Sequence, residues 1–339
     1  MPKRHLEGPT PQARAKLRKQ LGTLRQLTVQ PITRGRYNQA MADFFEFLKT
    51  IRRTIPPSAR ELDLLVSDYL EHLWAAGSGR TEGSNILAAL QDSQPHLKGQ
   101  LQQSWRLMKT WVVHEVPNRA PPLSLENLET LVGYSLFKGR PLFALSLLVG
   151  FFGLLRTGEL LALTASHISI SCAKGPAVIS LGLTKAGKRQ GAAESVTIHV
   201  EDVCRRLYQW KSQARSSASL TGSNYAWRKL FNETLAAVNF HKVDYRPYSL
   251  RRGGATHFFA HQGSFDKLLV LGRWQSAKTA RIYVNEGLSV LTNITLSLTP
   301  FTRNLRSQYL HSLTRPLPKL DHATQACRAG KLGRSTRKR

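Results

Sequence analysis

The chain has 339 residues, of which 41% are hydrophobic, and carries a formal net charge of +28 at pH 7 with an isoelectric point near 10.7. That length is enough for two domains with separate cores, and the hydrophobic content excludes wholesale disorder. The positive charge indicates a polyanionic partner. Nucleic acid fits best because lysines and arginines on phosphates release condensed counterions. An anionic membrane surface is the competitor, but no long basic amphipathic helix supports it.

The sequence gives no sign of secretion or of membrane insertion. Its N-terminus lacks an apolar signal segment, and the longest apolar run, 141–155, is too short to span a bilayer. The cysteines at 172, 204 and 327 are odd in number and far apart, which argues against a disulfide framework or a Cys-x-x-Cys zinc site. We expect an intracellular protein, in the nucleus of a eukaryotic host or in the cytoplasm or nucleoid of a bacterial one.

The first part of the chain is predicted to be a basic arm followed by a helical domain. Residues 1–34 are basic and interrupted by prolines, so we expect a mobile arm whose middle becomes helical on DNA. Residues 35–116 are predicted to form the domain, and Ser58 stands at an N-cap position within it. Apolar residues recur there at helical spacing in four segments: 36–53, 58–76, 81–91 and 100–116.

A linker at 117–123 contains two adjacent prolines, which end any helix. Beyond it, residues 124–300 are predicted as a mostly helical domain with a small antiparallel sheet, so the expected fold class is mainly α within α+β. Strand-like runs occupy 177–183 and 195–200, with a glycine-containing hairpin loop between them. Helices are expected at 124–137, 141–155, 203–215, 224–238, 249–262 and from residue 265.

A basic tail is predicted over 301–339, ending in K-L-G-R-S-T-R-K-R. Such a tail is usually solvated and disordered. A nuclear import signal and a second phosphate clamp are its alternative roles.

Several motifs of the second domain contain residues suited to phosphodiester chemistry. The segment G-L-L-R-T-G-E-L at 153–160 contains Arg156 and, one helical turn later, Glu159. The strand-like run V-I-S-L-G-L-T-K ends at Lys185, and Y-S-L-R-R-G-G-A-T contains Tyr248 and Arg251.

Trp274 and Tyr283 complete this pattern. Trp274 follows Arg251 by 23 residues and precedes Tyr283 by 9. In this order, the motifs resemble those of the tyrosine recombinases, the family of phage integrases, Cre and the Xer proteins. The resemblance covers about residues 35–290, weakly in the first half and specifically in the second. No single motif would carry it, whereas four in the expected order do.

The resemblance implies cleavage and rejoining of DNA through a 3′-phosphotyrosine intermediate, with no metal and no cofactor. Tyr283 is then the expected nucleophile. Arg156 and Arg251 would hold the phosphate through their planar guanidinium forks. Lys185 would protonate the departing 5′-oxygen, and Trp274 would donate its indole N–H to a non-bridging oxygen.

Glu159 is expected to orient Arg156 without direct chemistry. Tyr248 stands where the family usually has a histidine; it can donate a hydrogen bond to the phosphate, but its usual pKa of about 10 makes it a poor base. Arg273 lies between Gly272 and Trp274. It therefore adds one residue to the common spacing of the family, in which a histidine directly follows the glycine. Four basic residues are expected to contact DNA: Lys188, Arg189, Arg252 and Arg273.

The resemblance also implies double-stranded DNA as the partner, with a homotetramer on two duplexes and a monomer or weak dimer without DNA. A site-specific recombinase or transposase of a mobile element, a eukaryotic one included, is the implied function. Two alternatives stay open. The first is a catalytically silent DNA-binding relative, which Tyr248 makes credible, and the second is a DNA nicking-closing enzyme similar to type IB topoisomerases.

Individual residues also have simpler interpretations. Arg156 could be an ordinary cation near the C-terminal dipole of the apolar helix before it, and Trp274 could be a core aromatic. Lys185 is the weakest assignment because two more basic residues share its loop. Three tyrosines are rival nucleophiles to Tyr283: Tyr245, Tyr248 and Tyr309.

Overall fold

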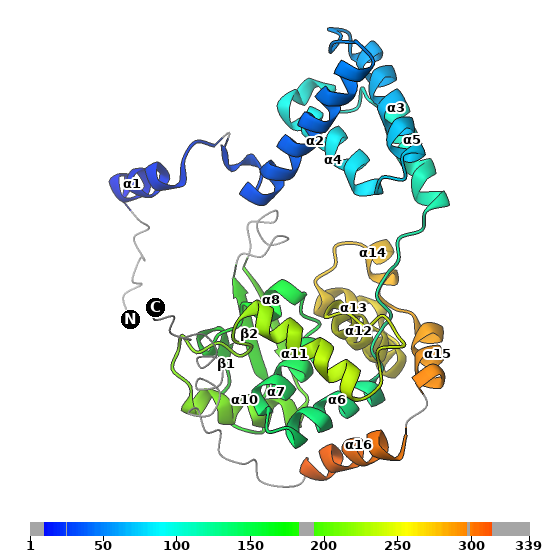
Figure 1. Cartoon of the computed structure of the whole chain (residues 1–339). Coiled ribbons are helices and arrows are strands. Elements are labelled where there is room, and N and C mark those ends of the chain that lie inside the picture. The colour runs from blue at the N-terminus through cyan, green and yellow to red at the C-terminus, as the bar shows by residue number, and fades with distance from the viewer. Residues whose placement is uncertain (1–9, 25, 183–192, 297–298, 314–339) are drawn as a thin grey trace, which may run out of the picture. The chain divides into compact units, whose positions relative to one another are not determined.

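A computed structural model of the chain describes residues 10–24, 26–182, 193–296 and 299–313 (Figure 1). The chain divides into two compact units, Met1–Asn118 and Arg119–Arg339, each with a hydrophobic core of its own. The structure is mainly helical with one small antiparallel sheet, which confirms the predicted fold class. In the ranges described, no helix has both the length and the apolar character needed to cross a membrane.

The regular secondary structure among the described residues of the first unit consists of helices. Helix α1 begins inside the predicted arm, where the Thr10 hydroxyl accepts a hydrogen bond from the backbone N–H of Ala13. Helix α2 begins earlier than predicted because Pro31 is suited to a first helical turn. The helices are α1 (Pro11–Leu21), α2 (Pro31–Thr50), α3 (Ala59–Ala75), α4 (Arg80–Ser93) and α5 (Gln102–His114), with short 3-10 helices at Gln26–Thr28 and Pro95–Leu97.

A buried carboxylate joins α3 to α5. Asp63 accepts hydrogen bonds from the backbone N–H groups of Gln103 and Ser104, both at 2.9 Å, and so caps the N-terminus of α5. Ser58 is the N-cap residue of α3 as predicted, although its side chain makes no capping hydrogen bond. The apolar faces of α2 to α5 form the core of this unit.

The second unit contains ten labelled helices and three strands among its described residues. The strands run antiparallel in the order β1-β2-β3, and Ile179 of β2 lies opposite Ile168 of β1 and Val196 of β3. Strand β1 was not predicted, because two residues are too short to show an alternating pattern. The strands are β1 (Ile168–Ser169), β2 (Ala177–Gly182) and β3 (Glu194–Ile198). The helices are α6 (Leu125–Phe137), α7 (Pro141–Phe152), α8 (Thr157–Leu161), α10 (Glu201–Gln213), α11 (Asn224–Ala237), α12 (Tyr248–Gln262), α13 (Phe265–Gly272), α14 (Ala277–Arg281), α15 (Glu286–Leu296) and α16 (Pro300–Ser312), with a 3-10 helix at Ala165–His167.

Two adjacent glycines of α12 allow close packing near the site described below. A Cβ atom on Gly253 would lie 1.9 Å from the carbonyl oxygen of Leu123, and one on Gly254 would lie 2.0 Å from that of Phe151. The predicted linker therefore ends inside the second unit, where residues 120–123 are buried. Helix α12 is held against both the chain entering this unit and the end of α7.

Gly254→Ala is expected to destabilise the second unit by about 3 kcal/mol, the upper part of the range for overpacking a core. The added methyl group would meet the backbone at the end of α7, which cannot move aside as a flexible side chain could. Denaturant-induced unfolding measures the change. Gly158→Ala is the matched control, because no atom lies within 4 Å of a Cβ there. Equal unfolding midpoints for the two variants would contradict the expectation.

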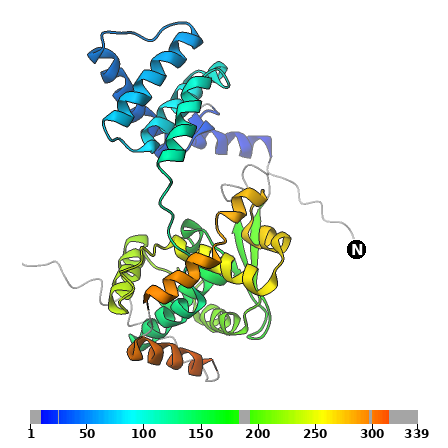
Figure 2. The ribbon, with the colours of Figure 1, turned by 90° about the vertical axis from the view of Figure 1, so that its right-hand side faces the viewer.

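The predicted basic tail begins as a packed helix. Helix α16 lies against α6, where a Cβ on Gly133 would be 2.1 Å from the carbonyl oxygen of Leu305 (Figure 1 and Figure 2). Leu305 and Tyr309 are buried in the core of the second unit, and Arg306 pairs with Glu129 at 2.6 Å. The expectation of a solvated tail from residue 301 is therefore wrong up to residue 313. Spacing by four places two large side chains on one helical face despite the surrounding charge.

Candidate active site

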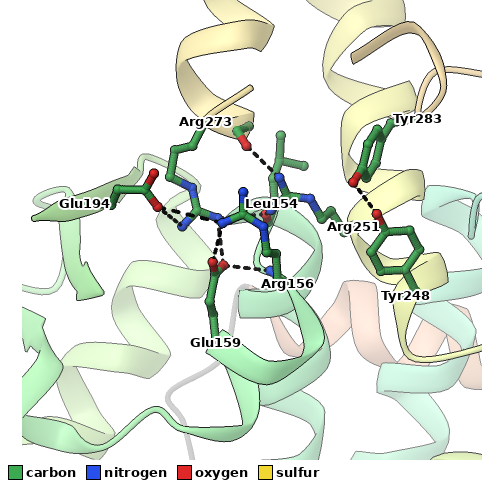
Figure 3. Close-up of polar contacts among 9 residues, drawn as sticks. Leu154, Arg156, Glu159, Glu194, Tyr248, Arg251, Arg273 and Tyr283 are labelled. Carbon is green, nitrogen blue, oxygen red and sulfur yellow. Dashed lines mark hydrogen bonds and ion pairs between the residues drawn. The ribbon is translucent and has the colours of Figure 1, made fainter. Parts of the chain in front are cut away.

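Arg251 is buried in the first turn of α12, with no exposed surface. Its guanidinium donates hydrogen bonds to the carbonyl oxygens of Leu154, just after α7, and of Gly272, which ends α13; the second is 2.6 Å long (Figure 3). Burial and the nearby charges of Arg273 and Arg156 lower the pKa of Arg251 to about 10. The group therefore remains charged at neutral pH.

Tyr283 and Trp274 lie together against this guanidinium. The ring centroids of Trp274 and Tyr283 are 4.5 Å apart. The guanidinium carbon of Arg251 lies 4.8 Å from the Trp274 ring and 5.4 Å from the Tyr283 ring, within the range of cation–π attraction. The structure thus brings together three residues that the sequence predicted to share a site.

The backbone beside Tyr283 is fixed by two side chains of α12. Arg252 donates to the carbonyl oxygen of Ile282 at 3.0 Å and also to that of Ala120, while Thr256 donates to the carbonyl oxygen of Tyr283 at 3.3 Å. Arg252 is only 4% exposed. Its guanidinium holds the segment that carries Tyr283, and its predicted contact with DNA stays a prediction.

The hydroxyl of Tyr248 donates a hydrogen bond to the hydroxyl of Tyr283 (Figure 3). Burial raises the pKa of Tyr248, and the hydrogen bond raises it further. Burial also acts to raise the pKa of Tyr283. The Tyr248 hydroxyl, the indole of Trp274 and the charges of Arg251 and Arg156 outweigh burial and lower this pKa. Of the two tyrosines, Tyr283 is thus the one that ionises more readily. The predicted partner of the Tyr248 hydroxyl was a phosphate, whereas here it is Tyr283.

Arg156 is the N-cap residue of α8, and Glu159 lies in the first turn. The Glu159 carboxylate accepts the backbone N–H of Arg156 at 2.8 Å and its guanidinium at 2.6 Å. Burial acts to raise the pKa of Glu159, but Arg273 and Arg156 outweigh it and lower the value. The contact agrees with the expected orienting role of Glu159. Arg156 itself begins α8 instead of closing α7, which excludes its simpler interpretation.

Glu194 and Arg273 join this pair from other elements. Arg273 follows α13 and lies 2.9 Å from a Glu159 oxygen and 3.7 Å from a Glu194 oxygen. Glu194, the first residue of β3, lies 3.7 Å from the Arg156 guanidinium. The Arg273 side chain is only 7% exposed and forms ion pairs inside the unit, and its predicted contact with DNA stays a prediction. Sequence reasoning missed Glu194, although it is the lone acid closing a basic hairpin.

Two rival nucleophiles lie in environments that disfavour ionisation. Tyr245 is 4% exposed, its hydroxyl accepts a hydrogen bond from Asn127 at 3.0 Å, and burial raises its pKa. Tyr309 is 6% exposed and donates to Asp202 at 3.2 Å; burial and this carboxylate raise its pKa. Both tyrosines therefore serve the packing of the second unit.

The predicted acid and two predicted DNA contacts fall outside the described residues. Lys185, Lys188 and Arg189 belong to the segment 183–192, so their roles stay predictions. In the ranges that the structure describes, no three His, Cys, Asp or Glu side chains are grouped as metal ligands.

Several buried donors of the site make no hydrogen bond to any described residue. They are Nε of Arg251, Nε and Nη1 of Arg273, and Nε1 of Trp274. Buried donors in folded proteins are nearly always paired, so an unpaired cluster needs an explanation. Three guanidinium groups and two carboxylates leave an excess of positive charge here. The arrangement suits an anion with several oxygen atoms, next to Tyr283, whose pKa is lowered.

The fold is similar to those of solved tyrosine recombinases. The XerH site-specific recombinase bound to difH substrate, in a pre-cleavage complex, matches over 77% of this chain and 78% of its own, with 14% identity and a TM-score of 0.50. The Tn1549 transposon integrase in complex with transposon right-end DNA matches over 83% and 96%, with 12% identity and a TM-score of 0.54. No family model and no curated protein matches the sequence. The likeness therefore establishes the fold alone.

Proposed function

We propose that this chain, which has the fold of the tyrosine recombinases, is a site-specific DNA recombinase or transposase. It would cleave and rejoin double-stranded DNA through a 3′-phosphotyrosine bond. The observation that carries the proposal is the position of Tyr283: its hydroxyl accepts a hydrogen bond from Tyr248, and its ring lies against the guanidinium of Arg251. The lowered pKa of Tyr283 supports its role as nucleophile.

The proposed reaction assigns one step to each group. The Tyr283 hydroxyl gives its proton to solvent water, and the phenolate oxygen attacks the phosphorus, forming a new P–O bond while the bond to the 5′-oxygen breaks. Arg251 and Arg156 stabilise the charge on the non-bridging oxygens, and the buried N–H of Trp274 donates to one of them. The departing oxygen takes a proton from an acid, for which Lys185 stays the expectation. Attack by a 5′-hydroxyl on the phosphotyrosine reverses these steps and rejoins the strand.

Charge and architecture support DNA as the partner. Helix α1 has four basic residues and no acidic one, and the whole chain carries +28. The similar structures of XerH and of the Tn1549 integrase are complexes with DNA. We therefore propose that the chain binds double-stranded DNA, and the homotetramer on two duplexes stays what the family resemblance implies.

The test uses nicked duplexes from which the short cleaved strand diffuses away, so that the covalent intermediate accumulates. A library of duplexes, nicked near a randomised sequence, is incubated with the protein, and covalent adducts are separated under denaturing conditions. An adduct on selected sequences supports the proposal, whereas tight, salt-sensitive binding without any adduct favours the silent DNA-binding alternative. Exchange of strands between two duplexes, in contrast to relaxation of one supercoiled plasmid alone, distinguishes a recombinase from a nicking-closing enzyme.

In Tyr248→Phe, the cleavage rate is expected to rise with pH over a higher pH range than in wild type. The lost hydroxyl stabilises the Tyr283 phenolate, so its removal raises the pKa of Tyr283. A rise of one pKa unit lowers the phenolate fraction about tenfold at any pH well below the pKa. Single-turnover cleavage rates across pH 6–10 measure the shift. Tyr248→His should instead add an inflection near pH 6.5, the usual histidine pKa. A Tyr248→Phe profile that overlays that of wild type would contradict the assignment.

A further inference from the structure

Arg273 has an unusual backbone conformation for an arginine. Its φ is +56°, in the left-handed region that favours glycine, and its N–H closes the last turn of α13 on the carbonyl oxygen of Val270 at 3.1 Å. A glycine would fit this helix end without strain. For a residue with a Cβ atom this conformation costs free energy, which favourable contacts of the side chain can offset.

Those contacts come from the candidate active site. One Arg273 nitrogen lies 2.9 Å from Glu159 and 3.2 Å from the carbonyl oxygen of Leu154, and the other lies 3.7 Å from Glu194 (Figure 3). The same two carboxylates hold Arg156, at 2.6 Å and 3.7 Å. Two arginines are thus bridged by two glutamates, and the four residues come from the end of α13, from α8 with its N-cap, and from β3.

The network also sets the charge of the site. Tyr248 is neutral, so the charged groups of this network within the described residues are three arginines, Arg156, Arg251 and Arg273, and the two carboxylates of Glu159 and Glu194. Their formal sum is +1, which one phosphodiester group would balance. Without Arg273 the sum is zero, and Glu159 and Glu194 would compete with the phosphate for the guanidinium of Arg156.

We propose that Arg273 is a positioning residue of the strand-cleaving site. By engaging both carboxylates, it holds Glu159 in the place where Glu159 orients Arg156, and it offsets the negative charge that would otherwise weaken phosphate binding. The inference rests on the proposed function. It assigns to Arg273 a role that needs neither contact with DNA bases nor exposure to solvent, in agreement with its burial.

The test compares Arg273→Gly with Arg52→Gly. Glycine adopts the left-handed backbone without strain and removes the whole side chain, the guanidinium included. Arg52, exposed at the end of α2, has a φ of +53° and is the matched control in the first unit. Single-turnover cleavage of a nicked duplex at saturating protein should fall at least tenfold in Arg273→Gly, with DNA affinity within about threefold of wild type. Arg52→Gly should cleave at the wild-type rate under the same conditions.

The pH dependence separates positioning from support of the fold. Arg273 and Arg156 lower the pKa of Glu159 against the effect of burial, and Glu194 is the other carboxylate facing these arginines. In Arg273→Gly the pKa of Glu159 therefore rises, so protonation of Glu159 should reduce cleavage at a higher pH than in wild type. The fall in cleavage rate at low pH is the acid limb of the profile. The double variant Arg273→Gly/Glu159→Gln has no carboxylate at residue 159 to protonate, so it should lose this limb.

Three outcomes decide between the possibilities. A tenfold or greater loss with the acid limb moved to higher pH supports the inference. A wild-type rate, or an equal loss at every pH together with a lower melting temperature, overturns it while wild type still forms its adduct. Absence of an adduct in wild type, with the protein folded and DNA bound, overturns the proposed function itself.

Discussion

Tyr283→Phe is expected to form no covalent adduct with nicked DNA under conditions where wild type accumulates one. The substitution removes the single oxygen atom that would attack phosphorus, so the loss should reach the detection limit, at least about a thousandfold for an essential nucleophile. Binding of the duplex should persist, because the ring still packs against Trp274 and Arg251. Denaturing gels measure the adduct and a mobility shift measures the binding.

The matched control for this variant is Tyr225→Phe. Tyr225 is a tyrosine of α11 whose side chain is 78% exposed, so its hydroxyl does not support the core. It should form the adduct at the wild-type yield. Adduct formation by Tyr283→Phe at the yield of this control would reject Tyr283 as nucleophile.

Removing the guanidinium of Arg156 or Arg251, the two proposed phosphate ligands, should reduce the cleavage rate at least about a hundredfold, the scale known for the loss of one oxyanion donor. In Arg156→Ala the cleavage rate should fall by a larger factor than the DNA affinity at fixed salt, because the guanidinium is needed most when charge develops on the phosphate. Its side chain is 33% exposed, so the variant should fold. Single-turnover rates and equilibrium binding, measured on one preparation, separate the two effects.

Arg251 needs a more conservative variant. It is fully buried and donates to the carbonyl oxygens of Leu154 and Gly272, so alanine would remove both of these hydrogen bonds from the core. Arg251→Lys retains charge but lacks the planar fork. It should melt near the wild-type temperature and still cleave at least tenfold more slowly. Equal losses in binding and cleavage for both arginine variants would show that these residues only anchor the phosphate.

The sequence predicted the main elements because their apolar residues repeat at helical spacing. It failed where that signal was weak or masked by charge. Strand β1 has two residues and no alternation to read, while α16 was hidden within a basic segment although Leu305 and Tyr309 share a buried face. The predicted linker was too long because its last residues pack on Gly253, a contact that local patterns do not reveal.

In the site, too, the sequence predicted one part and failed to predict another. The order and spacing of Arg251, Trp274 and Tyr283 predicted that they share a site, and the structure brings them into contact. The pairing of Arg273 with Glu194 joins the end of α13 to the first residue of β3, far away in the sequence. Such a contact depends on tertiary packing, and residue type alone made Arg273 a candidate for DNA instead.

The identity of the tyrosine in the covalent adduct tests the central claim most directly. Wild-type adduct is trimmed with nuclease and digested with trypsin, which cleaves after Lys or Arg except before Pro. Tyr283 is then the single tyrosine of the peptide 282–303, whereas Tyr245 and Tyr248 share 243–251 and Tyr309 falls in 307–319. Mass spectrometry should find the nucleotide remnant on 282–303. A remnant on either of the other two peptides, at any DNA sequence that gives an adduct, would contradict the account.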